Sequence, residues 1–546
     1  MASKGRLMET AQYEPLPAET ETSPGNPSPL PPGAHRVAVV DLGSNSIRLL
    51  LAQVDAQGRV QVLNCVKSMV KLGEGAFEND ALQPAAMDRT IAVLKTFART
   101  CHMYGVEQIA AVATASVREA SNGRAFVERA KLETGVRFNV ISGPEEARLV
   151  SIGVEAGLPL SDHPRVFMDI GGGSTEFAVS RNGEILAAES LHVGCVRLAD
   201  RFFRKENGKV PRSLFEDVQN YVREKSFLPF ERVRASRPAE MIASSGTAGA
   251  LGAMAEAMRH GSSDDQGGRY VLLDEVRAIS ERLCGTTPAE RLRLPGMSAR
   301  RVDVIIPGAA IFLTAMEELG FDRAEITERG LRDGVLLQHL ENSGLIPGKA
   351  REREQKINAV KGFARTFSAD LFHAKKVSGF VLQLFDQARR ESLVELDPVW
   401  RDILFYAAWL QETGIAISYH NLAEHSAYIV ANSELLGFTE YETQQIAAVI
   451  FRSRYQGREE PGYIALSSND WKEAALAGLL LKVAEGLDKS HRGAVTGFNL
   501  EARGRQVVMG VRADSESPIE RENLTRIAKT MTSRLGRTFS VVWSAS

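Results

Sequence analysis

The sequence predicts an α/β fold with two related halves, followed by an all-α region and a small α/β tail. Strand-like apolar runs, a tight turn and helical periodicity begin near Arg36, and the same order begins again near Arg165. From about Ile346 to about Leu500 the apolar residues recur at helical spacing, with few strand signals. The chain has 546 residues, 44% of them hydrophobic, which is enough for about three or four domains.

Short apolar runs in the first half predict strands, and one longer periodic run predicts a helix. The expected strands are residues 37–40, 47–54, 60–66, 109–113 and 138–141, and the expected helix is residues 87–104. The restart near Arg165 indicates a duplicated α/β domain. The last segment predicts strands at residues 506–511 and 539–543 around a helix at residues 520–535.

Five segments are therefore expected along the chain. Residues 1–34 carry prolines among Glu, Ser and Thr without the apolar core of a signal peptide, which predicts a disordered tail. The other segments are two α/β domains, a helical domain and a small α/β domain, at residues 35–157, 158–345, 346–500 and 501–546.

Charge and cysteine content narrow the class of protein. The formal net charge is −2, so any grip on a polyanion must come from local groups of Lys and Arg, which argues against a dedicated nucleic-acid binder. The four cysteines are far apart and form no C-x-x-C pair, which suggests neither a zinc site nor a disulfide framework. No run reaches the roughly 18 apolar residues of a membrane span. We expect a cytoplasmic protein without nucleic-acid or membrane partners.

Two loops match between the halves. Asp41-Leu-Gly-Ser-Asn-Ser46 and Asp169-Ile-Gly-Gly-Gly-Ser174 share the preceding strand, the Asp, the first Gly and the last Ser, and a further strand follows each. A single Asp-x-Gly could be an ordinary strand end and turn, but two copies with the same flanks argue for a shared role. Neither is a Walker A loop or a dinucleotide turn, because no Gly-Lys-Ser/Thr follows and a strand comes next.

The residue types in these loops suit phosphate bound through a cation. An Asp at the end of a buried strand, followed by Gly and small polar residues, lies beside backbone N–H groups that point at one spot. Because Asp and phosphate are both anions at neutral pH, we expect Asp41 and Asp169 to hold Mg²⁺, which bridges to phosphate oxygens. Two facing copies would form a clamp.

Together with further motifs, the two loops resemble the exopolyphosphatase / guanosine pentaphosphate phosphohydrolase family. These motifs lie at residues 114–118, 143–149, 194–197, 245–247, 301–308 and 330–334. The similarity extends over nearly everything after about residue 35. It implies the actin-like ATPase (ribonuclease H-like) fold, in which two α/β domains close over a phosphate-binding cleft, followed by an HD-like helical domain.

The resemblance implies that water attacks the terminal phosphate of linear inorganic polyphosphate and releases orthophosphate, with Mg²⁺ or another divalent cation such as Mn²⁺. By similarity, Glu146 orients or deprotonates the water, and Glu145 is the alternative. From spacing alone, this pair could be two solvated carboxylates in the first turn of a helix. Arg118 matches the family's phosphate-binding arginine. The alternative interpretation is an ordinary arginine exposed on a helix.

The same resemblance assigns the metal and phosphate ligands. Asp169 and Glu176, together with Asp41, are expected to hold the metal. The residues expected to bind phosphate are Gly43, Ser44, Asn45, Ser46, Gly171, Gly172, Gly173, Ser174, Ser245, Gly246 and Thr247. The small polar side chains of the first loop suit hydrogen bonds to phosphate oxygens, whereas the three glycines of the second suit close backbone approach.

In the helical domain the resemblance is to an HD-like domain without its metal-binding pair. Gln411 and Glu412 stand where an active HD phosphohydrolase carries His and Asp, and this exchange should weaken a metal site. We therefore expect no second catalytic centre here. His420 and His425 are expected to pack and hydrogen-bond between helices.

Basic residues recur in the helical domain and could hold a polyphosphate chain by counterion release. The residues expected to line such a path are Lys361, Arg365, Lys375, Lys376, Arg452 and Arg454. Taken singly, each could belong to a solvated helix face.

The leading interpretation is an exopolyphosphatase, and the family resemblance implies that it forms a homodimer. Hydrolysis of guanosine pentaphosphate to tetraphosphate, alone or as a second activity, would use the same carboxylates. A phosphotransferase of the same fold and a non-catalytic polyphosphate or nucleotide sensor are the remaining alternatives.

Overall fold

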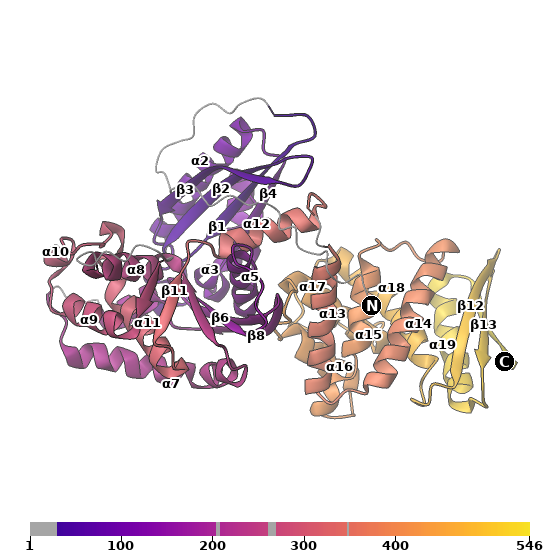
Figure 1. Ribbon diagram of the computed structural model, residues 1–546. Helices are drawn as coiled ribbons and strands as arrows, with labels where there is room; N and C mark the ends of the chain where they lie inside the picture. The colour runs from indigo at the N-terminus through magenta and orange to yellow at the C-terminus, as the bar shows by residue number, and fades with distance from the viewer. Residues whose placement is uncertain (1–29, 204–207, 260–268, 347–348, 546) are drawn as a thin grey trace. The chain divides into compact units, whose positions relative to one another are not determined.

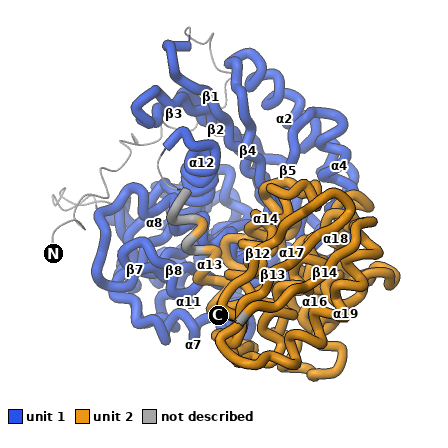
Figure 2. The backbone as a smooth tube through the Cα atoms, turned by 90° about the vertical axis from the view of Figure 1, so that its right-hand side faces the viewer, with its two compact units in different colours: residues 1–351 blue, residues 352–546 orange. Residues whose placement is uncertain are grey.

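The computed structural model describes residues 30–203, 208–259, 269–346 and 349–545. The chain falls into two compact units, residues 1–351 and 352–546 (Figure 2). Most of the expected tail, residues 1–29, lies outside the described residues. Within the described ranges, no helix is long and apolar enough to cross a membrane.

The first half of unit 1 is an α/β layer structure. Its strands are β1 (His35–Leu42), β2 (Ser46–Val54), β3 (Val60–Met69), β4 (Gln108–Ala113) and β5 (Phe138–Val140), in the order β3-β2-β1-β4-β5. Its helices are α1 (Ala76–Asn79), α2 (Pro84–Met103), α3 (Ala115–Glu119), α4 (Gly123–Thr134) and α5 (Gly143–Glu155). The first three strands form an antiparallel meander, and β4 and β5 join it in parallel. All five strands predicted for this half are present.

The second half repeats this plan (Figure 1). Its strands are β6 (Arg165–Ile170), β7 (Thr175–Arg181), β8 (Glu184–Leu191), β9 (Glu240–Ser244), β10 (Tyr270–Leu272) and β11 (Arg323–Ile326), in the order β10-β11-β9-β6-β7-β8. β6, β7 and β8 form the antiparallel meander, and β9 and β11 join it in parallel. The edge strand β10 has no counterpart in the first sheet. The duplication predicted from the sequence is therefore present in the strand topology.

The second half has its own set of helices. They are α6 (Cys195–Leu198), α7 (Arg212–Ala235), α8 (Ser245–Arg259), α9 (Leu273–Cys284), α10 (Pro288–Arg291), α11 (Ile305–Leu319) and α12 (Leu331–Asn342), with a π turn at Ala199–Phe203 and a 3-10 turn at Ala299–Arg301. Val166 and Met168 of β6 point into a core with α7, α9 and α11, whereas Phe167 points to the opposite face. This alternation is the ordinary consequence of strand geometry.

Helices α5 and α12 lie between the two sheets and exchange partners. α5 belongs by sequence to the first half but packs against β6, β7 and β8, whereas α12 ends the second half and packs against β1 and β4. At their crossing, a Cβ on Gly153 would lie 2.1 Å from the Gly330 carbonyl oxygen. A Cβ on Gly334 would lie 1.9 Å from the Leu149 carbonyl oxygen. The close approach of the two backbones therefore requires glycine at both positions.

Unit 2 is mainly helical and ends in a small sheet. Its helices are α13 (Lys349–Thr366), α14 (Leu371–Arg390), α15 (Trp400–Leu410), α16 (Leu422–Ala431), α17 (Glu440–Arg454), α18 (Ser468–Gly486) and α19 (Pro518–Leu535), with a 3-10 turn at Thr413–Ala416. Its strands are β12 (Val495–Arg503), β13 (Gln506–Ala513) and β14 (Thr538–Ala545), in that order. The sequence analysis missed β12, because a bulge between Val495 and Gly497 breaks the alternation of its apolar residues.

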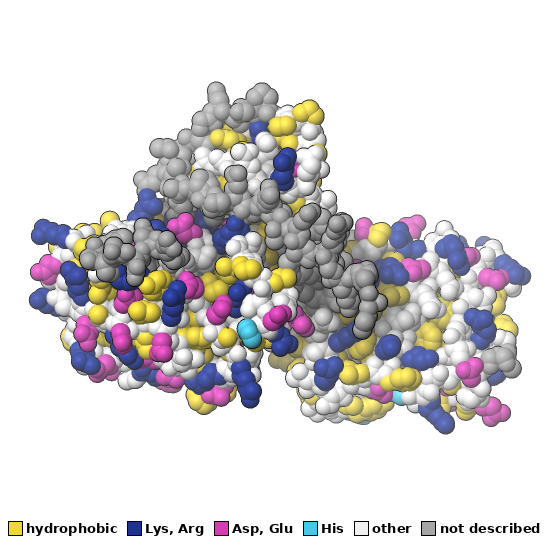
Figure 3. Space-filling model, in the orientation of Figure 1, with side chains coloured by type: hydrophobic (Ala, Val, Ile, Leu, Met, Phe, Trp, Pro, Cys, Tyr) yellow, Lys and Arg dark blue, Asp and Glu magenta, His cyan; other side chains and the backbone are white. Residues whose placement is uncertain are grey.

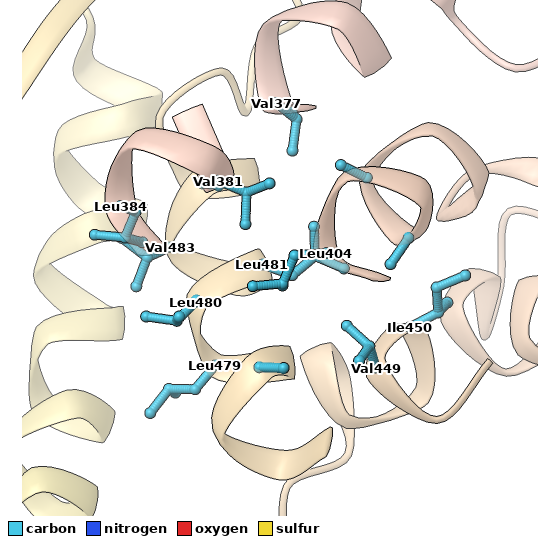
Figure 4. Packing of buried hydrophobic residues seen from close by; sticks show 14 of the residues in the cluster. Val377, Val381, Leu384, Leu404, Val449, Ile450, Leu479, Leu480, Leu481 and Val483 are labelled. Atoms are coloured by element: carbon cyan, nitrogen blue, oxygen red, sulfur yellow. The ribbon is translucent and has the colours of Figure 1, made fainter. Parts of the chain in front are cut away.

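One hydrophobic core runs through the helices of unit 2 and continues into its sheet. Figure 4 shows Val381 of α14 beside Leu481 of α18, with Leu404 of α15 close by. The core also includes Phe498 of β12 and Leu524 of α19. The C-terminal sheet and the helices thus share a core, and the boundary expected at residue 500 falls inside β12.

The surface carries charges of both signs. On the face shown in Figure 3, Lys and Arg side chains are interspersed with Asp and Glu on both units. This distribution agrees with the net charge of −2. All four cysteines are buried, and none of them forms a disulfide within the described residues.

The crossing of α5 and α12 has no room for a methyl group, so Gly334→Ala should lower the free energy of unfolding by roughly 1–3 kcal/mol, the usual cost of overpacking. Thermal unfolding of the full chain, followed by circular dichroism, measures the change. Gly249→Ala on α8 is the control, because a Cβ there meets no atom within 4 Å. Equal stability of the two variants would contradict the close crossing.

Candidate active site

The two matched loops close hairpins of the same geometry. In the first loop the Gly43 N–H donates to the Ser46 carbonyl oxygen at 3.1 Å. In the second loop the Gly171 N–H donates to the Ser174 carbonyl oxygen at 2.9 Å. The loops are therefore structural copies of each other, as the repeated residues predict.

The cross-strand partners of the two aspartates differ. Asp41 at the end of β1 pairs with Arg48 of β2, whereas Asp169 at the end of β6 pairs with Glu176 of β7. Arg48 Nη1 lies 3.7 Å from Asp41 Oδ2. One loop thus places a cation beside its aspartate, and the other places a second carboxylate there.

The two loops pack directly against each other. A Cβ on Gly172 would lie 3.0 Å from the Ser44 Cβ, and a Cβ on Gly173 would lie 2.5 Å from the Phe77 ring. Ser44 is only 2% exposed. The glycines, which the sequence assigned to close approach of phosphate, are therefore also required for the contact between the loops.

A small pocket of about 90 Å³ lies between the loops. Four carboxylates line it, from Asp41, Glu146, Asp169 and Glu176. The loop residues in its lining are Gly43, Ser44, Asn45, Ser46, Gly171, Gly172, Gly173 and Ser174, all expected there from the sequence. Acidic groups from both halves of unit 1 thus meet where the two loops meet.

Serine hydroxyls from neighbouring strands hold two of these carboxylates. Ser244 Oγ at the end of β9 donates to Asp169 Oδ2 at 2.9 Å, and Ser190 Oγ on β8 donates to Glu176 Oε1 at 2.9 Å. The sequence analysis missed both serines. Their positions follow from strand order, which brings residues far apart in the chain to the same end of the sheet.

The first turn of α5 separates the roles of its two glutamates. Ser142 Oγ accepts from the Glu145 N–H and caps the helix. The Glu145 carboxylate forms two bonds of 2.7 Å with the Arg148 guanidinium, whose side chain is 2% exposed. Glu145 is therefore engaged in a buried ion pair, whereas Glu146 faces the pocket.

Arg118 contacts Glu146 and is not among the described residues that line the pocket. Its Nη1 donates to the Ile141 carbonyl oxygen at 2.8 Å and to Glu146 Oε2 at 3.2 Å. In this arrangement Arg118 orients the Glu146 carboxylate and partly neutralises it.

Burial governs the charges in the pocket. Burial raises the pKa of Glu146 to about 7, Arg118 opposes the rise, and Asp169 and Asp41 add to it. Burial also raises the pKa of Asp169, and burial followed by repulsion from Glu146 raises the pKa of Glu176 well above its usual range. Repulsion between the Glu146 and Glu176 carboxylates therefore opposes ionisation of both, and a cation between them would relieve it.

The pocket fits a hard divalent cation such as Mg²⁺, because its donors are carboxylate and hydroxyl oxygens. Among the described residues, no three of its carboxylates bring oxygens within 4.8 Å of one another. Mg²⁺ usually takes one or two carboxylates and completes its octahedron with water and phosphate oxygens. Asp169, with Asp41 or Glu176, would hold it in this way and relieve their repulsion.

A second pocket, of about 460 Å³, adjoins the first and is rich in cationic side chains. Arg48, Asp169 and Arg301 belong to the lining of both pockets. The cationic residues of the larger pocket are Arg48, Lys67, Arg269, Arg300, Arg301, Arg329 and Arg332, and its acidic residues are Asp169 and Glu328. The sequence analysis assigned no site role to these cations, because they come from separate strands, helices and loops. We call this the cationic pocket.

Ser245 and Gly246 at the start of α8 line both pockets, as expected of phosphate-binding residues. A Cβ on Gly246 would lie 1.6 Å from Arg301 Nη2, so glycine is needed for Arg301 to lie there. Thr247 is fully buried and lies in neither lining. Its backbone N–H donates to Ser245 Oγ at 3.2 Å, which helps to start the helix.

The basic residues expected along a polyphosphate path lie on three helices of unit 2, namely α13, α14 and α17. Arg365 and Lys375 are exposed, and Lys361 Nζ lies 5.4 Å from the centre of the Trp409 ring. Lys376 is partly buried. Arg454 pairs with Glu485 at 3.0 Å.

Among the six basic residues expected along the path, Arg452 differs in being buried and bonded to the backbone. It is 7% exposed, and its guanidinium donates to the Tyr455 and Arg458 carbonyl oxygens. These bonds hold the segment after α17.

Two glycine loops, a buried carboxylate cluster and an adjoining cationic pocket are the features of an enzyme that hydrolyses phosphates. Comparison with known families agrees. The sequence matches the Ppx/GppA phosphatase family over residues 50–343 and domain III of that family over residues 355–523. The chain belongs to the Ppx/GppA phosphatase family, and its substrate contains phosphate.

Solved structures are similar to just over half of this chain, over nearly their own whole length. An exopolyphosphatase from Cytophaga hutchinsonii is 29% identical, with 56% of this chain and 98% of that chain covered and a TM-score of 0.52. An exopolyphosphatase-like protein is 25% identical, with 56% and 98% covered and a TM-score of 0.51. An Aquifex aeolicus family member is 26% identical, with 57% and 99% covered and a TM-score of 0.47. The expected actin-like α/β fold, followed by a mainly helical region, is confirmed.

The raised pKa of Glu146 predicts a pH-dependent effect of Glu146→Gln on stability. In the folded protein the pKa of Glu146, about 7, lies above the ordinary value of 4.5, so folding favours the neutral carboxyl. This contribution to stability is lost as the pH rises from 4.5 to 7. Glutamine stays neutral, so the variant should gain up to about 3 kcal/mol over the parent at pH 8 and much less at pH 5.

Thermal unfolding at both pH values, without metal, measures this gain. Glu128→Gln on α4 is the control, because the Glu128 side chain is 61% exposed. A gain from Glu146→Gln that is equal at the two pH values would contradict the raised pKa.

Proposed function

We propose that the chain is an exopolyphosphatase that releases terminal orthophosphate from linear inorganic polyphosphate with the help of Mg²⁺. The observation that carries the proposal is the cationic pocket beside the carboxylate cluster. Seven cationic residues against two acidic ones in its lining suit a substrate with one negative charge per phosphate unit. The exopolyphosphatase from Cytophaga hutchinsonii supports the same assignment.

In the proposed reaction the terminal phosphate lies in the small pocket and the rest of the chain extends into the cationic pocket. Backbone N–H groups of the two loops and the start of α8 hold the phosphate oxygens. Glu146 accepts a proton from the attacking water, and Arg118 fixes the direction of its carboxylate. Arg301, at the boundary of the two pockets, stabilises the negative charge.

Mg²⁺ bound by the aspartates would neutralise the charge on the transferred phosphate. A pKa of Glu146 near 7 suits a general base at neutral pH. Because the base must be ionised, kcat/KM should fall as pH drops below that value.

Hydrolysis of guanosine pentaphosphate is the second candidate, because its terminal phosphate could enter the same small pocket. Among the described residues, neither lining includes an aromatic ring on which guanine could stack. This favours polyphosphate. The deciding experiment compares orthophosphate release from long polyphosphate and from guanosine pentaphosphate at matched concentration with Mg²⁺ present. Release from guanosine pentaphosphate alone would refute the proposal.

Glu146→Gln should lower kcat for polyphosphate by about a hundredfold or more with little change in binding, the usual effect of removing a general base. Initial rates of orthophosphate release measure kcat, and filter binding of labelled polyphosphate measures affinity. Glu128→Gln again provides the exposed control. If Glu146→Gln were as active as the parent, Glu146 would not be the base.

Arg301→Ala should raise KM for polyphosphate roughly 10- to 100-fold, because a charge-assisted hydrogen bond contributes about 1.5–3 kcal/mol. It should also make KM less sensitive to salt. Arg212→Ala on α7 is the matched control, since this side chain is 83% exposed. A KM unchanged by Arg301→Ala would remove the cationic pocket from substrate binding.

A further inference from the structure

Unit 2 contains a cluster of metal-ligating side chains that the proposed function does not use. His373 of α14, Glu412 after α15 and His491 after α18 each place one ligand atom within 4.8 Å of the others. Glu412 Oε1 lies 3.9 Å from His373 Nε2 and 3.4 Å from His491 Nε2. Neighbouring donors in a tetrahedral zinc site are about 3.3 Å apart, given bonds of about 2.0–2.2 Å. Because the two imidazole planes are parallel, closing this triangle around an ion requires His491, the more exposed ligand, to turn out of the stack.

A second carboxylate orients each imidazole from the opposite side. His373 Nδ1 lies 2.9 Å from Asp488 Oδ2, and His491 Nδ1 lies 3.1 Å from Asp370 Oδ2. With Nδ1–H donating to these carboxylates, both rings present the lone pair of Nε2 toward Glu412. Metal-binding histidines are typically held in this way, because the carboxylate fixes the tautomer and strengthens the ligand.

Backbone groups hold the two orienting carboxylates in place. Asp488 Oδ1 accepts from the Gly493 N–H at 2.7 Å. Asp370 caps α14, where its Oδ1 accepts from the N–H groups of Phe372 and His373 at 3.0 and 3.1 Å. The two supporting carboxylates are therefore held in place before an ion binds.

The cluster is closed on one side and open on the other. The side chain of His373 is 1% exposed, that of Glu412 is 15% exposed and that of His491 is 36% exposed. The two imidazole rings are stacked, with 3.7 Å between centroids and 1° between planes. An ion can enter past His491.

We propose that His373, Glu412 and His491 bind one divalent transition-metal ion, for which Zn²⁺ is the best match. Two imidazoles and one carboxylate suit zinc, whereas Mg²⁺ and Ca²⁺ prefer ligand sets made of oxygen alone. Three protein ligands leave a fourth position for water. The ion joins the start of α14 to the segments after α15 and α18 and so stabilises unit 2. This site is independent of the substrate of unit 1.

The sequence predicts only a weakened metal site here, because Gln411 and Glu412 stand where a metal-binding pair was expected. That prediction gave no metal-binding role to His373 or His491. The fold brings both imidazoles to Glu412, which supplies the nitrogen ligands that the local sequence lacks.

The test uses the full chain, stripped of metal with a chelator and titrated with Co²⁺ and with Zn²⁺. We expect one high-affinity equivalent, a Co²⁺ visible absorption band of tetrahedral type, and a rise in Tm that grows with Zn²⁺ concentration. His491→Ala should weaken binding at least about tenfold and remove the absorption band, while metal-free stability stays close to that of the parent. Glu412→Gln should also weaken metal binding.

His420→Ala is the matched control, because His420 is an exposed histidine of the same unit outside the cluster. It should bind Co²⁺ and Zn²⁺ like the parent. Glu146→Gln should also keep the tetrahedral Co²⁺ band, which separates this site from the carboxylates of unit 1. If the parent shows no tetrahedral band, or if His491→Ala binds as tightly as the parent, the cluster is an ion-pair network and the proposal fails.

Discussion

The close crossing of α5 and α12 is the constraint on which the site in unit 1 depends. Gly153 and Gly334 let the two backbones touch, and any side chain at these positions would separate them. Because α5 rests on the second sheet and α12 on the first, the crossing couples the two halves. Both helices begin at the small pocket, where α5 contributes Glu146 and α12 contributes Leu331. The position of the proposed base relative to Asp169 is therefore set by helix packing.

That packing brings together carboxylates that repel one another. Burial and mutual repulsion raise the pKa values of Glu146 and Glu176, while the guanidinium of Arg118 only partly offsets the cost. Such a cluster lowers the stability of the protein without ligand, a common feature of active sites. A divalent cation together with a polyanionic substrate would offset this loss of stability, because the cation pairs with the carboxylates and the substrate pairs with the arginines.

The two units concentrate different ligand chemistries. The small pocket in unit 1 offers carboxylates and hydroxyls, the oxygen donors that hard cations prefer. The cluster in unit 2 offers two imidazoles and one carboxylate, a set that favours a borderline-soft ion. In both places the charged groups are held by hydrogen bonds from residues distant in the chain, such as Ser244 to Asp169 and His373 to Asp488.

Features that depend on local pattern could be predicted from the sequence alone. Asp41 and Asp169 could be assigned to equivalent strand ends because strand, turn and glycine signals involve neighbouring residues. The repeat of these signals predicted the duplicated fold. The resemblance favoured Glu146 over Glu145, and the structure shows that Glu146 is the one that faces the pocket. Consecutive helix positions point in different directions, so packing selects which of the two does so. The cationic pocket around Arg301, the exchange of helices between sheets and the meeting of His373 with His491 join segments far apart in the chain. Their proximity depends on how the elements pack, and local sequence patterns do not predict it.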